Sequence, residues 1–222
     1  MASRRIFRAM AILLDERWAE ELWASPYRLR FELNAGQPLD GDSYVGMFTS
    51  SYDRARELAR AALTTRTPHG IVSAWANASW ILAAMNGREA TMSGFDMLAR
   101  MGVPTDPAEA IWQGHVYRGD AEDDEMAPCE HRAVRLTWDQ ADILLWNNIA
   151  QEIGVEPKAP VCSTLIDLEQ GVSVVAYDDR GVDITALEFA SIEPLYRRYD
   201  AWLLDRDRPR MAEVFGPRIE GG

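Results

Sequence analysis

Residues 161–177, VCSTLIDLEQGVSVVAY, carry the strongest indication of the fold. Two apolar runs, 161–168 and 172–177, are separated by Gln170 and Gly171, a pair typical of a tight turn. This pattern predicts a β-hairpin. We therefore expect a sheet with antiparallel strands in the second half of the chain.

Strand and helix patterns follow one another along the rest of the chain. Apolar and polar residues alternate from Tyr27 to Leu33, which predicts a half-buried strand. Further strands are predicted at 71–75 (extending towards 80), 110–117 and 132–136. Helices are predicted at 6–22, 44–62 and 91–101. A fourth helix is predicted from the capping box of Thr137 and Gln140 to Gly154. The last helix is predicted to begin at a Ser191 cap, to contain Pro194 in its first turn and to end at residue 208.

This order of elements predicts an α+β fold. We expect a mostly antiparallel sheet of about five to seven strands with helices packed on it. A single domain is expected over residues 1–218, followed by a disordered tail at 219–222. The alternative is a division into two lobes with the seam near 119–130, where the chain is rich in acids.

Composition excludes several classes of protein. The formal net charge is -12, whereas a protein that binds nucleic acid needs a basic face. We expect no nucleic-acid partner, and no membrane partner because no stretch is long and apolar enough to span a bilayer. The N-terminal residues are interpreted as a helix rather than a signal peptide. Because Cys129 and Cys162 are too few for a disulfide framework, we expect a cytoplasmic protein with reduced thiols.

Residues 178–183, DDRGVD, concentrate charge at the end of the hairpin. In a functional interpretation, Asp179 or Asp183 acts as a base and Arg180 holds an anionic group. In a structural interpretation, an aspartate caps backbone N–H groups of the turn, Gly181 adopts a positive φ, and Arg180 pairs with an acid. Both interpretations are compatible with the residues alone.

The last predicted helix provides further candidates for binding. Its aromatic face is either core or a stacking surface, and residues 205–208, DRDR, are either a solvated helix end or an ionic patch for a partner. The candidate binding residues are Asp178, Asp179, Arg180, Asp183, Tyr199, Trp202, Asp205, Asp207 and Arg208.

Familiar catalytic and cofactor motifs are missing from the chain. It has no Gly-rich phosphate-binding loop, no His-Glu-x-x-His and no Gly-x-Ser-x-Gly. A metal site needs three or four ligands, so the pair formed by Cys129 and His131 is interpreted as structural. We expect no metal and no cofactor. Arg28 and Arg30 share one strand face, which is either a basic groove or the solvated side of the sheet.

Two segments resemble a bacterial family called domain of unknown function 3885. They are YDDRGxD at 177–183 and LYxxYxxWLLDxDR at 195–208. The segments RFEL at 30–33 and YxRA at 52–55 are similar to the opening of that family, whereas residues 87–132 depart from its pattern. The resemblance implies a soluble bacterial protein, and no catalytic residue is carried over from it.

Two functions from different classes are compatible with these observations. The acidic composition and the missing motifs favour a non-catalytic protein-binding module, such as an immunity-type or regulatory inhibitor of a partner with a basic surface. The alternative is a small enzyme, with or without a metal ion, whose catalytic candidates are Asp179, Arg180 and Asp183. We expect the first function and no catalysis.

Overall fold

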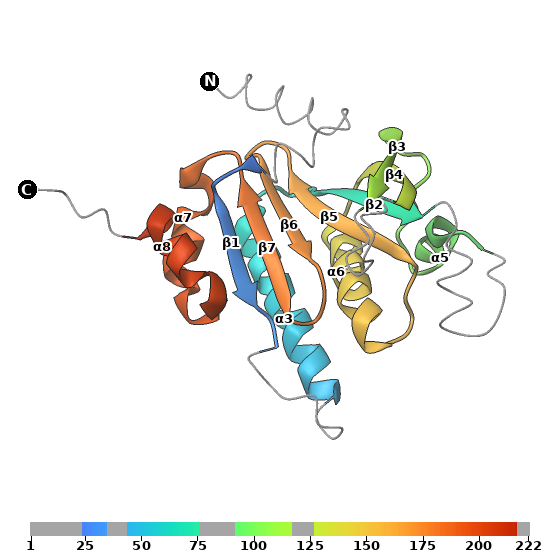
Figure 1. The fold of residues 1–222 in the computed structure, drawn as a ribbon. Coiled ribbons are helices and arrows are strands. Elements are labelled where there is room, and N and C mark those ends of the chain that lie inside the picture. The colour runs from blue at the N-terminus through green and yellow to red at the C-terminus, as the bar shows by residue number, and fades with distance from the viewer. Residues whose placement is uncertain (1–23, 35–43, 76–91, 117–126, 217–222) are drawn as a thin grey trace, which may run out of the picture.

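The computed structural model of the protein describes residues 24–34, 44–75, 92–116 and 127–216. Its centre is a seven-stranded sheet in the order β1-β7-β6-β5-β2-β4-β3, antiparallel between all neighbours (Figure 1). The strands are β1 (Arg28–Glu32), β2 (His69–Trp75), β3 (Ala110–Val116), β4 (Ala127–Arg135), β5 (Val161–Asp167), β6 (Val172–Ala176) and β7 (Gly181–Ala186). The predicted α+β class and antiparallel sheet are confirmed.

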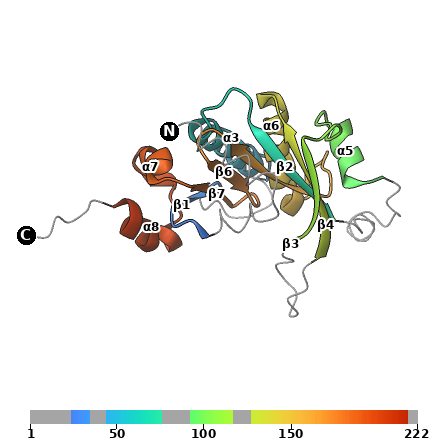
Figure 2. The ribbon, with the colours of Figure 1, turned by 90° about the horizontal axis from the view of Figure 1, so that it is seen from above.

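The helices of the described ranges are arranged around this sheet. They are α3 (Tyr44–Ala62), α5 (Gly94–Arg100), α6 (Trp138–Ile153), α7 (Phe189–Arg198) and α8 (Arg208–Phe215). Helices α3 and α6 lie side by side on one face, whereas α7 and α8 lie beside β1 at one end of the sheet (Figure 1, Figure 2). No helix of the described ranges combines the length and the apolar composition that crossing a bilayer requires.

The main core lies between the sheet and the pair α3 and α6. Strand alternation directs Leu29 and Phe31 of β1 towards these helices, and both side chains are fully buried. On the helix side, Leu58 of α3 and Leu144 of α6 are equally buried in the same cluster. The residues between the apolar positions, such as Arg30, consequently point to the opposite face of the sheet, called the second face below.

A smaller apolar cluster occupies the second face near the other end of the sheet. Ile71, Ala133 and Ile166, from the neighbouring strands β2, β4 and β5, are each at most 5% exposed. Trp112 of β3 packs against them. The second face of the sheet is thus polar at β1 and β7 and apolar at β5, β2 and β4.

Helix α6 begins and ends as its sequence predicts. The Thr137 hydroxyl accepts the Gln140 amide at 3.2 Å and the Gln140 side chain accepts the Thr137 amide at 2.9 Å, which completes the predicted capping box. Gly154 terminates the helix with a left-handed φ of 66°.

Two adjacent asparagines attach α6 to the start of β5. Asn147 is fully buried; its Oδ1 accepts the Ala159 amide at 2.7 Å and its Nδ2 donates to the Val161 carbonyl at 3.0 Å. Asn148 makes the equivalent pair of bonds with the backbone of Ser163, at 3.1 and 2.8 Å. Two side chains on a mostly apolar helix therefore satisfy backbone groups that burial would otherwise leave without partners.

Two glycines with positive φ provide a matched test of turn strain. Gly154 (φ 66°) has no heavy atom within 4 Å of an added Cβ, whereas at Gly171 (φ 64°), in the predicted hairpin turn, an added Cβ would lie 2.9 Å from Leu187 Cδ1. We expect Gly154→Ala to lower the free energy of unfolding by about 1 kcal/mol and Gly171→Ala by about 2 kcal/mol, because the second adds a clash to the strain. Urea denaturation measures both, and equal losses would contradict the contribution from Leu187.

Two strands differ from the prediction. Strand β4 begins at Ala127 instead of residue 132, because it pairs with both β2 and β3. Residues 178–183 were predicted to be a turn, but only 178–180 turn the chain, and Gly181–Ala186 forms β7 between β1 and β6. The apolar half of β7 is buried, so tertiary pairing outweighs the turn propensity of its first residues.

The C-terminal helix prediction is wrong in three respects. Helix α7 begins at Phe189 with Glu188 as its N-cap, instead of a Ser191 cap, and Pro194 lies inside the helix. Packing explains the earlier start, because Phe189 stacks on the Phe215 ring at 5.4 Å. The helix also ends at Arg198, and residues 200–202 and 205–207 form short 3-10 turns instead of continuing it.

The end of α7 is explained by the unpaired edge of β1. Leu203 forms an antiparallel bridge with Phe31, and the Leu204 amide donates to the Arg30 carbonyl at 2.9 Å. An extended backbone at Leu203 and Leu204 therefore supplies hydrogen-bond partners to the edge strand β1. A continuous helix could not pair with the strand in this way. The predicted helix at 6–22, the tail at 219–222 and most of the proposed seam at 119–130 lie outside the described residues.

Candidate functional site

Arg30 unites the two charged segments that the sequence singles out. On the second face of β1 it stands opposite Asp183 of β7, and its Nε donates to Asp183 Oδ1 at 2.8 Å. Its Nη1 donates to Asp207 Oδ2 at 2.9 Å, just before α8. The three side chains are 13–23% exposed. One guanidinium thus connects β1, β7 and the C-terminal segment, and we call these residues, with Tyr177, the Arg30 cluster.

The electrostatics of the cluster reflect a partly buried ion pair. Burial raises the pKa of Asp183 above its usual range, although the hydrogen bond and the charge of Arg30 oppose this. Burial alone would lower the pKa of Arg30, but Asp183 raises it overall. Each charge is therefore stabilised by the other, because an unpaired charge at this depth would be costly.

Tyr177 covers the cluster from the end of β6. The guanidinium of Arg30 lies 5.6 Å from the centre of the Tyr177 ring, within cation–π range. The ring lies directly over Gly181, where an added Cβ would overlap the tyrosine hydroxyl. The predicted positive φ of Gly181 is wrong, because the described glycines with positive φ are Gly102, Gly154 and Gly171. Close approach of Tyr177 accounts for the glycine instead.

Asp178 acts as a turn residue, as the structural interpretation predicts. Its Oδ1 accepts the amides of Arg180 at 2.7 Å and Gly181 at 3.1 Å, and its Oδ2 accepts the guanidinium of Arg180. The residue is only 3% exposed. Its carboxylate is therefore occupied by backbone amides and by an intramolecular ion pair.

Asp179 is also buried, and its backbone contacts α3. Its carbonyl accepts the hydroxyl of Ser51 at 2.7 Å. Burial, with a smaller contribution from the charge of Asp178, raises the pKa of the Asp179 carboxyl. The guanidinium of Arg180, in contrast, is largely exposed. The three candidate catalytic residues therefore differ in environment: Asp183 is paired with Arg30, Asp179 is buried, and Arg180 extends outwards from its pair with Asp178.

The C-terminal segment presents charge outwards while its aromatic rings pack inwards. Arg208 donates to Asp205 Oδ1 and to Asp200 Oδ1, both at 2.8 Å, yet the two aspartates are 93% and 65% exposed. Tyr199 is 5% exposed and packs edge-on against Phe31. We call Asp200, Trp202, Asp205 and Arg208 the C-terminal surface.

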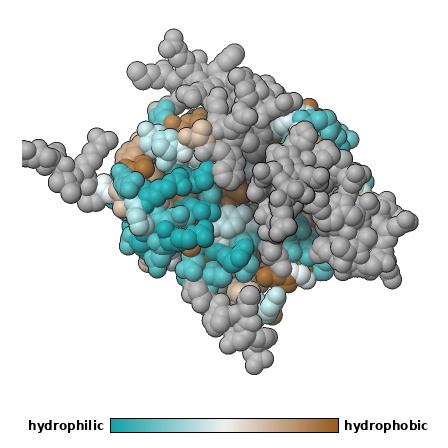
Figure 3. Space-filling view, in the orientation of Figure 1, coloured by the Kyte–Doolittle hydropathy of each residue, from teal (hydrophilic) through white to brown (hydrophobic). Residues whose placement is uncertain are grey.

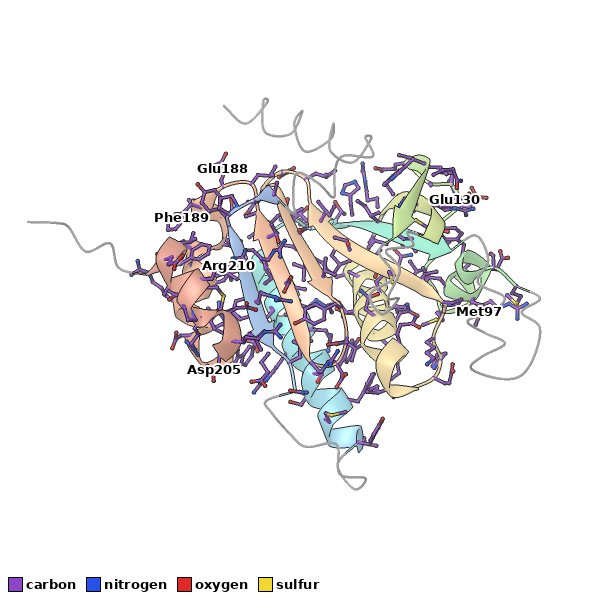
Figure 4. All side chains as sticks on the ribbon, in the orientation of Figure 1. Met97, Glu130, Glu188, Phe189, Asp205 and Arg210 are labelled. Atoms are coloured by element: carbon purple, nitrogen blue, oxygen red, sulfur yellow. The ribbon has the colours of Figure 1, made fainter. Side chains whose placement is uncertain are left out.

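The surface views also show charged groups on the outside of the C-terminal segment. Hydrophilic residues gather over α8, β1 and β7 (Figure 3). Asp205 lies at the outer end of the C-terminal segment, whereas Arg210 lies where α8 meets β1 (Figure 4). Trp202 is half-buried beneath the guanidinium of Arg54, 4.8 Å from the ring centre. The C-terminal surface therefore consists of exposed charges above packed aromatic rings.

Sequence reasoning singled out Cys129 and His131 as a structural pair but did not connect them with Ser73, and the three form a second group of polar side chains at the other end of the sheet. Ser73 Oγ lies 2.7 Å from His131 Nδ1, and His131 Nε2 lies 3.1 Å from Cys129 Sγ. The signal was the spacing of Cys129 and His131, which places both on one face of a strand. Ser73 could not have been found from local sequence. No group of three or more His, Cys, Asp or Glu in the described ranges is placed to hold a metal ion.

Comparison with known proteins identifies the family. No curated protein and no solved structure matches the chain. One family model does match, over residues 15–207, which is most of the chain. The matched region includes the Arg30 cluster, Asp200 and Asp205. The chain belongs to the family described as domain of unknown function DUF3885.

Proposed function

We propose that this protein is a soluble, cytoplasmic protein-binding module of bacteria that recognises a basic partner protein through its C-terminal surface. The observation that carries the proposal is the division of the charged residues into two sets. Asp178, Asp183 and Asp207 are committed to internal partners, whereas Asp200 and Asp205 of the same region are largely exposed. The internal ion pairs fix the backbone beneath Asp200 and Asp205. Side chains held in place before binding lose less conformational entropy when they contact a partner.

The charge of the chain supports a basic partner. The formal net charge is -12, and Asp200 and Asp205 are 65% and 93% exposed. Opposite charge on a partner accelerates encounter and favours the correct orientation, with a strong dependence on salt. An immunity-type inhibitor of a basic toxin, or a regulatory inhibitor of a basic enzyme, would use these properties.

Carboxylate catalysis at residues 178–183 is the less favoured alternative. A raised pKa at Asp179 and Asp183 suits acid–base chemistry. However, the hydrogen bonds of Asp178 serve the turn, and Asp183 shares its charge with Arg30 on the second face. The acids therefore support separate structural pairs rather than one shared reaction centre, and a catalytic role for Asp179, Arg180 and Asp183 stays a prediction.

A capture experiment tests the binding proposal. The tagged full chain is incubated with native host lysate at low and moderate salt, and captured proteins are quantified by mass spectrometry. We expect a stoichiometric basic partner whose capture weakens as salt rises. The double variant Asp200→Ala/Asp205→Ala is expected to lower the affinity for the isolated partner about tenfold, equivalent to about 1.4 kcal/mol.

A control variant removes the same charge elsewhere. Asp139 at the start of α6 and Glu169 of the β5–β6 turn are exposed acids away from the C-terminal surface. Asp139→Ala/Glu169→Ala is expected to bind like the wild-type chain. Capture of no stoichiometric protein at either salt, or the same loss of affinity in both double variants, would overturn the proposal.

A further inference from the structure

Ser73, Cys129 and His131 form a hydrogen-bonded series across β2 and β4. Ser73 is the register partner of His131, so both side chains project from the second face. The intervening Glu130 belongs to the opposite face, where it accepts a bond from Arg132 at 2.7 Å. Glu130 and Asp205 lie at opposite ends of the molecule (Figure 4). This series is therefore separate from the C-terminal surface.

The imidazole of His131 is held in one position by its neighbours. Trp112 of β3 stacks on it, with ring centres 5.3 Å apart and an interplanar angle of 19°. Gly114 also lies on β3. A Cβ added to it would lie 2.7 Å from His131 Nε2, so only glycine leaves room for the imidazole ring. Both ring nitrogens are also hydrogen-bonded. Such restraint is what a general base requires in order to act on one particular hydroxyl.

Burial keeps this series uncharged near neutral pH. It lowers the pKa of His131 below the usual value and raises the pKa of the Cys129 thiol to about 11. A neutral imidazole has one N–H and one acceptor nitrogen. We assign the N–H to Nε2, facing Cys129 Sγ, because the Ser73 hydroxyl is then free to donate to Nδ1 over the shorter 2.7 Å distance.

Exposure distinguishes the nucleophile from the positioning residue. Cys129 is fully buried, whereas Ser73 is only partly buried. A hydroxyl hydrogen-bonded to a base that a third group orients is the arrangement of an activated nucleophile. The neighbours on the second face, Ile71 and Trp112, are apolar or aromatic. They suit an apolar acyl group better than a charged one.

We propose that Ser73 and His131 form an acyl-transfer site that acts on small esters with an apolar acyl group. Ser73 Oγ attacks the carbonyl carbon while its proton passes to His131 Nδ1. The ester C–O bond then breaks, and the leaving alkoxide takes that proton. Water, deprotonated by the same nitrogen, then attacks the acyl-serine. The bond between the acyl carbon and Ser73 Oγ breaks, the acid is released, and His131 Nδ1 returns its proton to Ser73 Oγ. Cys129 positions the ring. This activity goes beyond the binding role and does not depend on it.

A fluorophosphonate probe tests the proposal on the full chain. Attack by Ser73 Oγ forms a P–O bond and expels fluoride, while the hydroxyl proton passes to His131. We expect tryptic mass spectrometry to find the label on Ser73, the label to be absent in Ser73→Ala, and labelling to be at least about tenfold slower in His131→Gln. Thr49→Ala, which removes an exposed hydroxyl on α3, is the control and labels like the wild type.

The pH profile of labelling gives a second readout. Because the pKa of His131 is lowered, the neutral base predominates already above about pH 6.5, so the wild-type labelling rate is expected to be level from pH 7 to 9. Cys129→Ala is expected to shift the pH at which the labelling rate falls on the acidic side of this profile. If Cys129 were only a structural residue, this pH would not change. The proposal is overturned by absence of label on Ser73 in the wild type, or by a rate proportional to hydroxide across this range.

Discussion

Replacement of Arg30 by methionine is expected to lower the free energy of unfolding by about 3 kcal/mol at pH 7, because two partly buried carboxylates lose their common partner. Asp183 and Asp207 both bind this guanidinium, at 2.8 and 2.9 Å. Methionine retains most of the apolar stem, so the loss reports mainly on charge. Chemical denaturation measures the effect.

The pH dependence of the Arg30→Met loss has a definite sign. Burial already raises the pKa of Asp183, and removal of Arg30 raises it further. A carboxyl with a folded pKa above its unfolded value is destabilising above that folded pKa, and the penalty disappears as pH falls through it. The difference between the variant and the wild type is therefore expected to shrink as pH falls from 7 towards 4.

Two controls accompany the Arg30 experiment. Arg197→Met breaks an exposed pair with Glu193, and we expect it to lower the stability by at most about 1 kcal/mol. Asp183→Asn, combined with Arg30→Met, removes one uncompensated charge and is expected to restore part of the loss. If Arg197→Met and Arg30→Met have equal effects, the Arg30 cluster is not the internal anchor that the geometry indicates.

Replacement of Asn147 by alanine is expected to lower the free energy of unfolding by about 3 kcal/mol. The side chain satisfies the Ala159 amide at 2.7 Å and the Val161 carbonyl at 3.0 Å, and all three residues are fully buried. Without it, two buried backbone groups lose their partners, each at a cost of about 1–3 kcal/mol. Urea denaturation at pH 7 measures the loss.

Asn147→Asp is the matched variant for this contact. It keeps an acceptor for the Ala159 amide but, when charged, turns a carboxylate oxygen towards the Val161 carbonyl. We expect a loss at pH 7 at least as large as that of the alanine variant, with recovery as pH falls and the carboxyl becomes a donor. A loss for the Asn147→Asp variant that does not change with pH would argue against the assigned geometry.

The two ends of the sheet offer functions that can be tested separately. The C-terminal surface lies beside β1, the edge strand at one end, whereas the series of Ser73, Cys129 and His131 lies on β2 and β4 towards the other end. A variant that abolishes labelling of Ser73 is thus expected to retain partner capture, and the Asp200→Ala/Asp205→Ala variant is expected to retain labelling. Each result bears on only one proposal.

Elements with strong local signals were predicted closely. Helix α3 has the predicted bounds, the capping box of Thr137 starts α6, and Gly171 turns the hairpin between β5 and β6. In each case the deciding interactions join residues within a few positions of each other: apolar spacing along one helix face, a side-chain cap, or a backbone angle suited to glycine. Such information is present in any short window of sequence.

Strand β7 and the C-terminal segment were missed for the opposite reason. Asp183 follows residues that favour a turn, yet it lies in a strand because β1 and β6 flank it. Leu203 has helical neighbours in sequence, yet it leaves the helix to pair with Phe31, far away in the chain. Local propensity differences are below about 1 kcal/mol per residue, so a few tertiary hydrogen bonds and buried side chains outweigh them.

The amino-acid sequence alone determined the α+β class, most of the element positions and the charged residues worth attention. Only the tertiary structure decided which of those charges face inwards: Asp183 and Asp207 meet on Arg30, while Asp205 remains exposed. It also brought Ser73 to His131, 58 positions away. The physical reason is that strand order and register, which set these encounters, depend on the burial of the whole sheet rather than on any short segment.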